Sequence, residues 1–171
     1  MESPAGRAYD PATPDDLYDR DVLLWSERQA DLLRRLARGE RVNDVDWAQV
    51  VEEIEDVGLS ELHAVESYLE LVLVHLLMAL TWPDSDAVQH WRAEIVAFQS
   101  NANRRFAPSM RQRIRLEKIY EAAVEQVSVL EGRSRSVPAP GVCPFTVDQL
   151  LNDKAAILEE RLRDASPRPT C

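Results

Sequence analysis

Apolar residues recur every three or four positions along most of the chain, which is the spacing of one face of an α-helix. No stretch shows the strict alternation of apolar and polar residues that is typical of a half-buried strand. The periodicity and the residues that start and stop each run predict helices over 15–38, from Asp46 to Gly58, from Ser60 to Trp82, from about 84 to Ala102, from about Leu116 to Leu130, and from Thr146 onward.

The helix predicted after Asp46 has an apolar stripe and an acidic outer side. Asp46 followed by Gln49 is a variant of the capping box, in which each side chain bonds the backbone N–H of the other residue. The apolar stripe consists of Trp47, Val50, Val51, Ile54 and Val57. Such a stripe predicts that this side of the helix packs against the core.

The segment from Ser60 to Trp82 is amphipathic at first and then becomes apolar all round. Residues 71–80 are all apolar except His75. A helix without a polar face must be surrounded by other elements, so this segment is expected to be the central helix. The run is ten residues long, whereas about 20 are needed to cross a bilayer, so no membrane anchor is expected.

These elements predict an all-α fold, a single-domain bundle of five to six helices around the central apolar helix at about 60–82. The domain is expected over 15–164, after a flexible N-terminal segment at 1–14 and before a loose tail at 165–171. Residues 132–145 contain three prolines and no periodicity, which predicts an irregular strap along the surface.

Composition excludes several classes of function. The formal net charge of −10 at pH 7 repels polyanions, so nucleic acid is an improbable partner. Five glycines, none in a phosphate-binding pattern, argue against the common nucleotide folds, and no cofactor is expected. The two cysteines, Cys143 and Cys171, have no metal-ligand spacing. No signal peptide is visible, so a cytoplasmic location is expected.

Charge is unevenly distributed along the chain. Residues 40–70 hold ten acidic side chains and one basic one, whereas residues 92–118 hold seven basic and two acidic ones. The two segments could balance each other within one molecule, attract each other across a dimer, or form separate docking surfaces.

Several blocks resemble one known family. They are LYDRDVLLW, DWAQVVEEIEDVGLSELHAVESYLELVLVHLL, the Trp of HWRAEI, and CPFTVDQLLND. Together they resemble the DUF29 family of small bacterial helical proteins, over about Leu17 to Asp153. The resemblance implies a helical fold and a bacterial origin but no reaction. The sequence departs from the family pattern at Met78, where the family often has Lys, and in the ending KAAILEERLR.

Glu53 and His75 are the main candidates for chemistry. Glu53 lies at the border of its helix's apolar stripe, and His75 shares a face with Tyr68 and Met78, so both side chains are expected to point inward. As partners, they could form a carboxylate-oriented imidazole for acid/base catalysis or part of a metal site. The alternative is architectural, a buried histidine satisfied by one carboxylate or carbonyl where two helices dock.

Other polar groups favour less specific interpretations. The chain has no Glu-x-x-His motif, and His63 lies about 18 Å along the helix from His75, so no metal site is expected. His63, Glu66, Ser67 and Glu70 share one helix face, which is typical of a solvated surface.

The sequence therefore favours a cytoplasmic association module that binds a protein partner or forms a homo-oligomer. The alternative is an enzyme in which Glu53 orients His75 as base, Tyr68 binds substrate, and a metal could assist hydrolytic chemistry. The pattern identifies neither a partner nor a small-molecule ligand, and it leaves the reactivity of Cys143 open.

Overall fold

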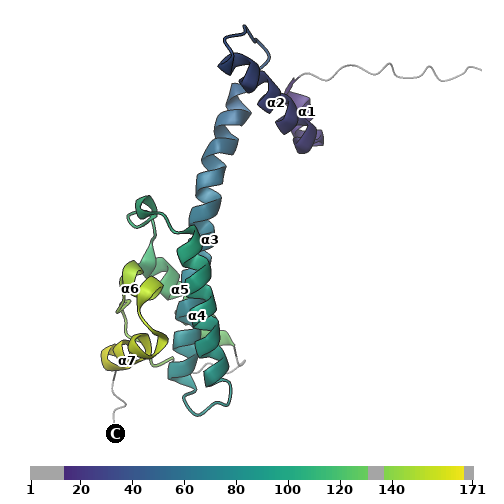
Figure 1. Cartoon of the computed structure of the whole chain (residues 1–171). Helices are drawn as coiled ribbons and strands as arrows, with labels where there is room; N and C mark the ends of the chain where they lie inside the picture. Colours follow the sequence, from purple (N-terminus) through teal and green to yellow (C-terminus); the bar gives the residue numbers. More distant parts are fainter. Residues whose placement is uncertain (1–13, 131–136, 168–171) are drawn as a thin grey trace, which may run out of the picture. The chain divides into compact units, whose positions relative to one another are not determined.

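The structure, a computed structural model, describes residues 14–130 and 137–167. Within these ranges all regular secondary structure is helical, which confirms the predicted all-α class (Figure 1). The α-helices are α1 (Pro14–Arg20), α2 (Val22–Ala37), α3 (Trp47–Thr81), α4 (Val88–Arg105), α5 (Leu116–Val129), α6 (Val147–Asn152) and α7 (Ala155–Ala165), with a 3-10 turn, η1, at Pro108–Met110.

Contacts between residues divide the chain into two compact units, Met1–Val57 and Gly58–Cys171, here called the N-terminal and C-terminal units. The single domain over 15–164 stays a prediction, because units defined by contacts need not be separate domains. The boundary falls inside α3, so each unit contains one part of that helix.

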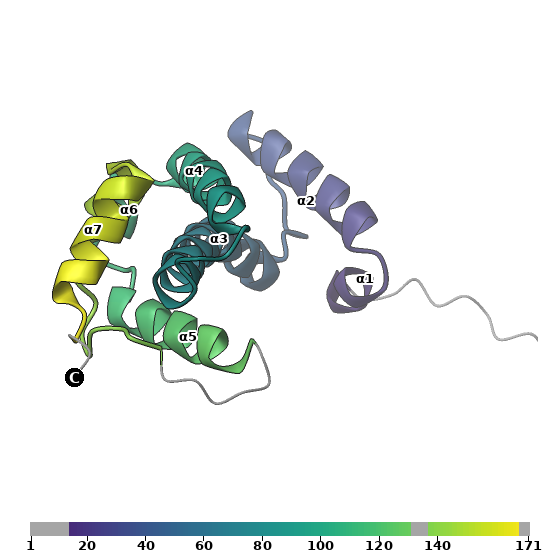
Figure 2. The same cartoon turned by 90° about the horizontal axis from the view of Figure 1, so that it is seen from below.

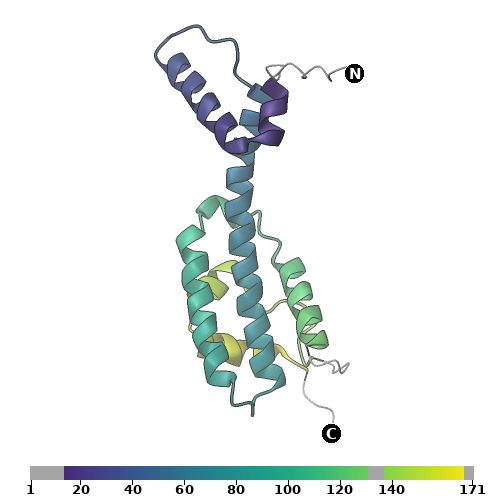
Figure 3. The ribbon, with the colours of Figure 1, turned by 90° about the vertical axis from the view of Figure 1, so that its right-hand side faces the viewer.

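The second half of α3 is the centre of the C-terminal unit, as its all-round apolar sequence predicts. Its fully enclosed side chains, each with an exposed fraction of 0%, are Val65, Leu69, Val72, Leu73, Leu76 and Leu77. Viewed along the helix, α4 and α5 lie on either side of it and α6 with α7 on a third (Figure 2). Figure 3 shows the same arrangement from the side. Ile95, Ala123 and Leu158 bring α4, α5 and α7 into the same core.

The N-terminal unit has a much smaller core. Its buried apolar side chains are Trp25, Leu32, Val45 and Val50. Tyr18 packs edge-on against Trp25, with ring centroids 5.0 Å apart. The prediction that the apolar stripe after Asp46 faces the core is wrong for most of its residues. Only Val50 is buried, whereas the other four residues are exposed, namely Trp47, Val51, Ile54 and Val57.

Two predicted helix boundaries are also wrong. Helix α3 continues through Gly58, where a stop was predicted, because Gly58 does not adopt the left-handed conformation that ends helices and no proline follows it. A glycine inside a helix costs only about 1 kcal/mol. The predicted helix over 15–38 is instead two helices, since the Asp21 carboxylate accepts a hydrogen bond from the Leu24 N–H and caps α2.

The N-cap of α3 forms only half of the predicted capping box. The Asp46 carboxylate accepts the Gln49 N–H at 3.3 Å, as predicted. The Asp46 N–H, however, donates to the side chain of Gln29 at 3.0 Å. Among the described residues, the buried side-chain oxygen of Gln49 consequently has no hydrogen-bond partner.

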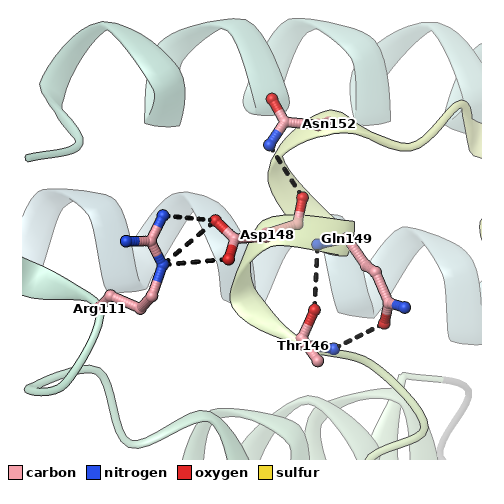
Figure 4. A network of polar contacts seen from close by, with 5 residues as sticks. All are labelled: Arg111, Thr146, Asp148, Gln149 and Asn152. Carbon is pink, nitrogen blue, oxygen red and sulfur yellow. Dashed lines mark hydrogen bonds and ion pairs between the residues drawn. The ribbon is translucent and has the colours of Figure 1, made fainter. Parts of the chain in front are cut away.

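Helix α6 begins at the capping box that the sequence predicts. The Thr146 hydroxyl accepts the Gln149 N–H, and the Gln149 side chain accepts the Thr146 N–H (Figure 4). Arg111 forms a two-pronged ion pair with Asp148 in the first turn. At the other end, Gln99 of α4 donates to the carbonyls of Leu150 and Asp153, so α6 is held by side chains from outside it.

Parts of the predicted strap and termini lie outside the described residues, namely 1–13, 131–136 and 168–171. Residues 137–145 are described and have no regular structure, in agreement with the predicted strap. By length and composition alone, α3 is long and apolar enough to cross a membrane. Core helices of folded domains meet the same criterion, and 50% of its most apolar window is buried within the structure.

Substitution of Gly58, with Gly39 as the comparison, tests whether α3 continues through Gly58. Gly58→Ala should raise the unfolding free energy by about 0.5–1 kcal/mol, because alanine favours the helix and a Cβ at this position meets no atom within 4 Å. Gly39→Ala should lower it by about 1 kcal/mol or more, because Gly39 has a φ of +85°. Urea unfolding followed by circular dichroism measures both. A helix that stops at Gly58 would show a loss of stability and helicity in Gly58→Ala as well.

Candidate functional site

His75 lies on the second half of α3 with both ring nitrogens bonded. Its side chain is 12% exposed. Nδ1 is 2.7 Å from the carbonyl oxygen of Leu71, one turn earlier on the same helix. Nε2 is 2.8 Å from a carboxylate oxygen of Glu94 on α4. The inward orientation predicted for His75 is therefore confirmed, but its partner is Glu94.

The Leu71 contact fixes the position of one ring hydrogen of His75. A carbonyl oxygen can only accept, so Nδ1 carries a hydrogen that it donates to Leu71. Nε2 is then the ring nitrogen that faces the Glu94 carboxylate.

Glu94 also connects the partly enclosed His75 to the molecular surface. Nε2 of His90, one turn earlier on α4, lies 3.4 Å from the same Glu94 oxygen. The His90 side chain is 71% exposed. The three side chains therefore form a chain of polar groups from solvent to the α3–α4 interface.

Tyr68 and His75 share a ring neighbour, Phe98 of α4. Tyr68 stacks on Phe98 of α4, with ring centroids 6.5 Å apart. Phe98 also contacts His75, with centroids 5.3 Å apart. One side of the imidazole consequently faces an aromatic ring. Its polar contacts are those with Leu71 and Glu94.

Glu53 is not part of this site. It lies in the N-terminal unit, where a carboxylate oxygen accepts the Tyr18 hydroxyl at 2.5 Å. This hydrogen bond raises the pKa of Tyr18 to about 12, so Tyr18 stays a protonated donor at every physiological pH. The predicted pair fails because a continuous α3 places Glu53 and His75 on one helix, 22 positions apart, instead of on two helices that face each other.

The role predicted for Glu53 is taken by Glu94, which was not among the predicted site residues. One signal in the sequence points to it. Two antiparallel helices joined by a short turn bring residues at equal distances from the turn opposite each other. His75 lies six residues before the end of α3, and Glu94 lies six residues after the start of α4.

The predicted charge balance within the molecule is slight. Among the described residues, Arg105 and Glu61 form the ion pair that joins the basic and acidic segments. Arg92 instead pairs with the buried Glu159 of α7, and Arg111 with Asp148. Most acidic side chains of 40–70 are therefore not neutralised by the basic segment.

The polar face of α3 is solvated as predicted, since His63 and Ser67 are exposed and Glu66 and Glu70 are half-buried. His63, Glu66, Ser67 and Glu70 form one wall of a hollow of about 540 Å³. Arg115 and Lys118 of α5 contribute to its other side. Neither this hollow nor a larger one at the end of α3 includes His75 or Glu94 in its lining.

Metal and thiol chemistry find little support in the described part of the chain. No three or more His, Cys, Asp or Glu side chains there are grouped so as to hold a metal ion. Cys143 is buried, and burial raises the pKa of its thiol to about 11. The reactive thiolate is therefore scarce at neutral pH.

Comparison with known proteins agrees with this helical architecture. The family model described as "Domain of unknown function DUF29" matches residues 17–155. The crystal structure of an alpha-helical protein of unknown function from Rhodospirillum rubrum is similar, with 28% sequence identity and a TM-score of 0.63. The match covers 88% of this chain and 98% of that one. No curated protein matches the chain.

Removing the Glu94 carboxylate tests the His75 contact. Glu94→Ala should lower the unfolding free energy by about 1–3 kcal/mol, because it leaves a largely enclosed ring nitrogen without its partner. Glu94→Gln should recover part of this loss, since its amide can still bond Nε2. His90→Ala is the matched control and should change stability by less than about 0.5 kcal/mol, because His90 is exposed. Equal stabilities of Glu94→Ala and His90→Ala in urea would show that the contact contributes nothing.

Proposed function

We propose that this chain, which belongs to the DUF29 family, is a protein-binding module whose N-terminal unit binds a basic amphipathic helix of a partner protein. The observation that carries the proposal is the exposed stripe, here defined as Trp47, Val51 and Ile54 on the first half of α3. These side chains are 58%, 52% and 67% exposed, respectively.

The stripe has the geometry of a helix-binding surface. Its members are spaced by four and then three residues, so they project from one side of α3. Seven of the twelve large apolar side chains that are exposed among the described residues belong to the N-terminal unit, although it is the smaller one. A concentration of exposed apolar groups is typical of an interaction surface.

Charge around the stripe selects the kind of partner. Glu52 and Glu55 lie beside it on α3, are exposed, and have no ion pair among the described residues. A partner with lysine or arginine flanking its apolar face would gain attraction at this rim. A second copy of the same stripe would bring acidic rims together, so the charge favours a different protein over self-association.

The enzymatic alternative depends on a contact between Glu53 and His75, but each of these side chains has another partner. That hypothesis requires Glu53 to orient His75, whereas Glu53 bonds Tyr18. The carboxylate that orients His75 is that of Glu94. The imidazole is largely enclosed by Leu71, Glu94 and Phe98. These contacts favour an architectural role for His75.

A designed peptide tests the proposal even while the natural partner is unidentified. The probe is an 18-residue helical peptide of leucine and lysine, with leucines on one face, titrated into the full chain and followed by calorimetry. Ile54→Asp should weaken binding at least tenfold, because burial of one isoleucine contributes about 1.5–3 kcal/mol. The loss should occur although the added negative charge attracts the peptide.

Val96→Asp is the matched control. Val96 lies on α4 in the C-terminal unit and is 58% exposed, so the substitution adds the same charge away from the stripe. It should leave the affinity unchanged or slightly higher. Equal affinities of the two variants would refute the proposed surface, as would a stripe-dependent dimer that excludes the peptide in light scattering. A leucine–glutamate peptide should bind far more weakly.

A further inference from the structure

The C-terminal unit contains a hollow of about 740 Å³ where α3 ends and the chain turns into α4. This volume lies within the range of about 300–1,000 Å³ that is typical of small-molecule sites. The apolar part of the lining comprises Met78, Leu80, Trp82, Pro83, Trp91 and Leu130. The hollow shares no residue with the proposed helix-binding surface.

Two tryptophan rings belong to this lining. The rings of Trp82, just after α3, and Trp91, on α4, have centroids 6.4 Å apart and are tilted by 57° to each other. The indole nitrogen of Trp82 is buried, so any part of this ring that lines the hollow is carbon. A single cation can lie within about 6 Å of both centroids, the distance over which an aromatic face attracts positive charge.

The charge of the lining has one sign. Asp84 is the one charged residue among the described residues that line the hollow. It is exposed, and within the described part of the chain its carboxylate has neither an ion pair nor a hydrogen bond. The hollow therefore attracts a cationic ligand and repels an anionic one.

The other polar groups of the lining favour a cation without N–H groups. The Thr81 hydroxyl donates to the carbonyl of Leu77, and the Ser85 hydroxyl oxygen accepts the N–H of Ala87 at 3.3 Å. A primary ammonium has three N–H donors, and a magnesium or calcium ion takes about six or more oxygen ligands. Both need more acceptors than one free carboxylate. A quaternary ammonium needs none, and aromatic faces are its usual binding surface in proteins.

We infer that this hollow binds a small quaternary ammonium compound, whose cationic head lies against Trp82 and Trp91 and beside Asp84. The methyl groups of such a head bury carbon surface against the two rings and the thioether of Met78, while its charge is attracted by the ring faces and the carboxylate. The site is independent of the proposed protein-binding surface, because its lining lies entirely in the C-terminal unit. Failure of one proposal leaves the other standing.

Two ligands of the same shape test the role of the charge on the full chain. Choline has a trimethylammonium head, and dimethylbutanol, its uncharged isostere, has carbon in place of the nitrogen. In nitrogen-proton NMR titrations, choline should shift the indole signals of Trp82 and Trp91, which are identified by their loss in Trp82→Phe and Trp91→Phe. Choline should bind at least about fivefold more tightly than dimethylbutanol. Absence of choline binding at tens of millimolar, or equal affinities of the two compounds, would overturn the inference.

Two aspartate variants test the position of the site. Asp84→Asn should weaken choline binding about two- to fivefold and leave dimethylbutanol binding unchanged, because it removes an exposed charge beside the cation. Asp86→Asn is the matched control, since Asp86 is exposed, lies two positions away and does not line the hollow. It should change the choline affinity by less than about twofold, because salt screens the more distant charge. Equal effects of the two variants would overturn the assigned position.

Phosphocholine distinguishes a free small molecule from a lipid head group. It has the same cationic head as choline and adds a phosphate, which Asp84 repels, so it should bind more weakly than choline. Vesicles of phosphatidylcholine should likewise not retain the chain on sedimentation. Tighter binding of phosphocholine than of choline, or retention by the vesicles that choline reverses, would overturn the assignment to a free molecule.

Discussion

The second half of α3 must be largely enclosed because it is apolar all round from Leu71 onward. Its side chains from Val65 to Leu77 include six that have no exposed surface at all. Burial of a leucine or valine stabilises a fold by about 1.5–3 kcal/mol, so these six side chains together contribute strongly to the stability of the C-terminal unit. The positions of α4, α5 and α7 follow from this requirement, since each supplies residues to the cover of one helix.

The same constraint explains the polar contacts at the α3–α4 interface. His75 interrupts the apolar run and is partly enclosed with it, so its ring nitrogens need partners from within the protein. Leu71 and Glu94 provide them, and Phe98 covers one side of the ring. At the end of α3 the cover is incomplete, since Met78 and Trp82 are only half-buried and line a hollow together with Trp91. The first half of α3 has a different environment, because its stripe at Trp47, Val51 and Ile54 is exposed.

Local patterns in the sequence were sufficient for the helical class, the central helix and the Thr146–Gln149 cap, because each depends on residues close together in the chain. The continuation of α3 through Gly58 was not predictable from the glycine itself, whose cost in a helix is small enough for its neighbours to override. Glu94 was missed because its importance arises from antiparallel pairing with α3. The exposed stripe was assigned to the core because periodicity shows that a face is apolar but does not show what covers it.

Native-state hydrogen exchange along α3 measures the difference between its two halves directly. Amides from Leu69 to Leu77 should exchange only through global unfolding, with opening free energies equal to the stability measured in urea. Amides from Val51 to Val57 should exchange with clearly lower opening free energies, because that half has an exposed apolar face and a small core. Equal protection in both halves, or stronger protection before Gly58, would contradict the claim that enclosure of the second half organises the fold.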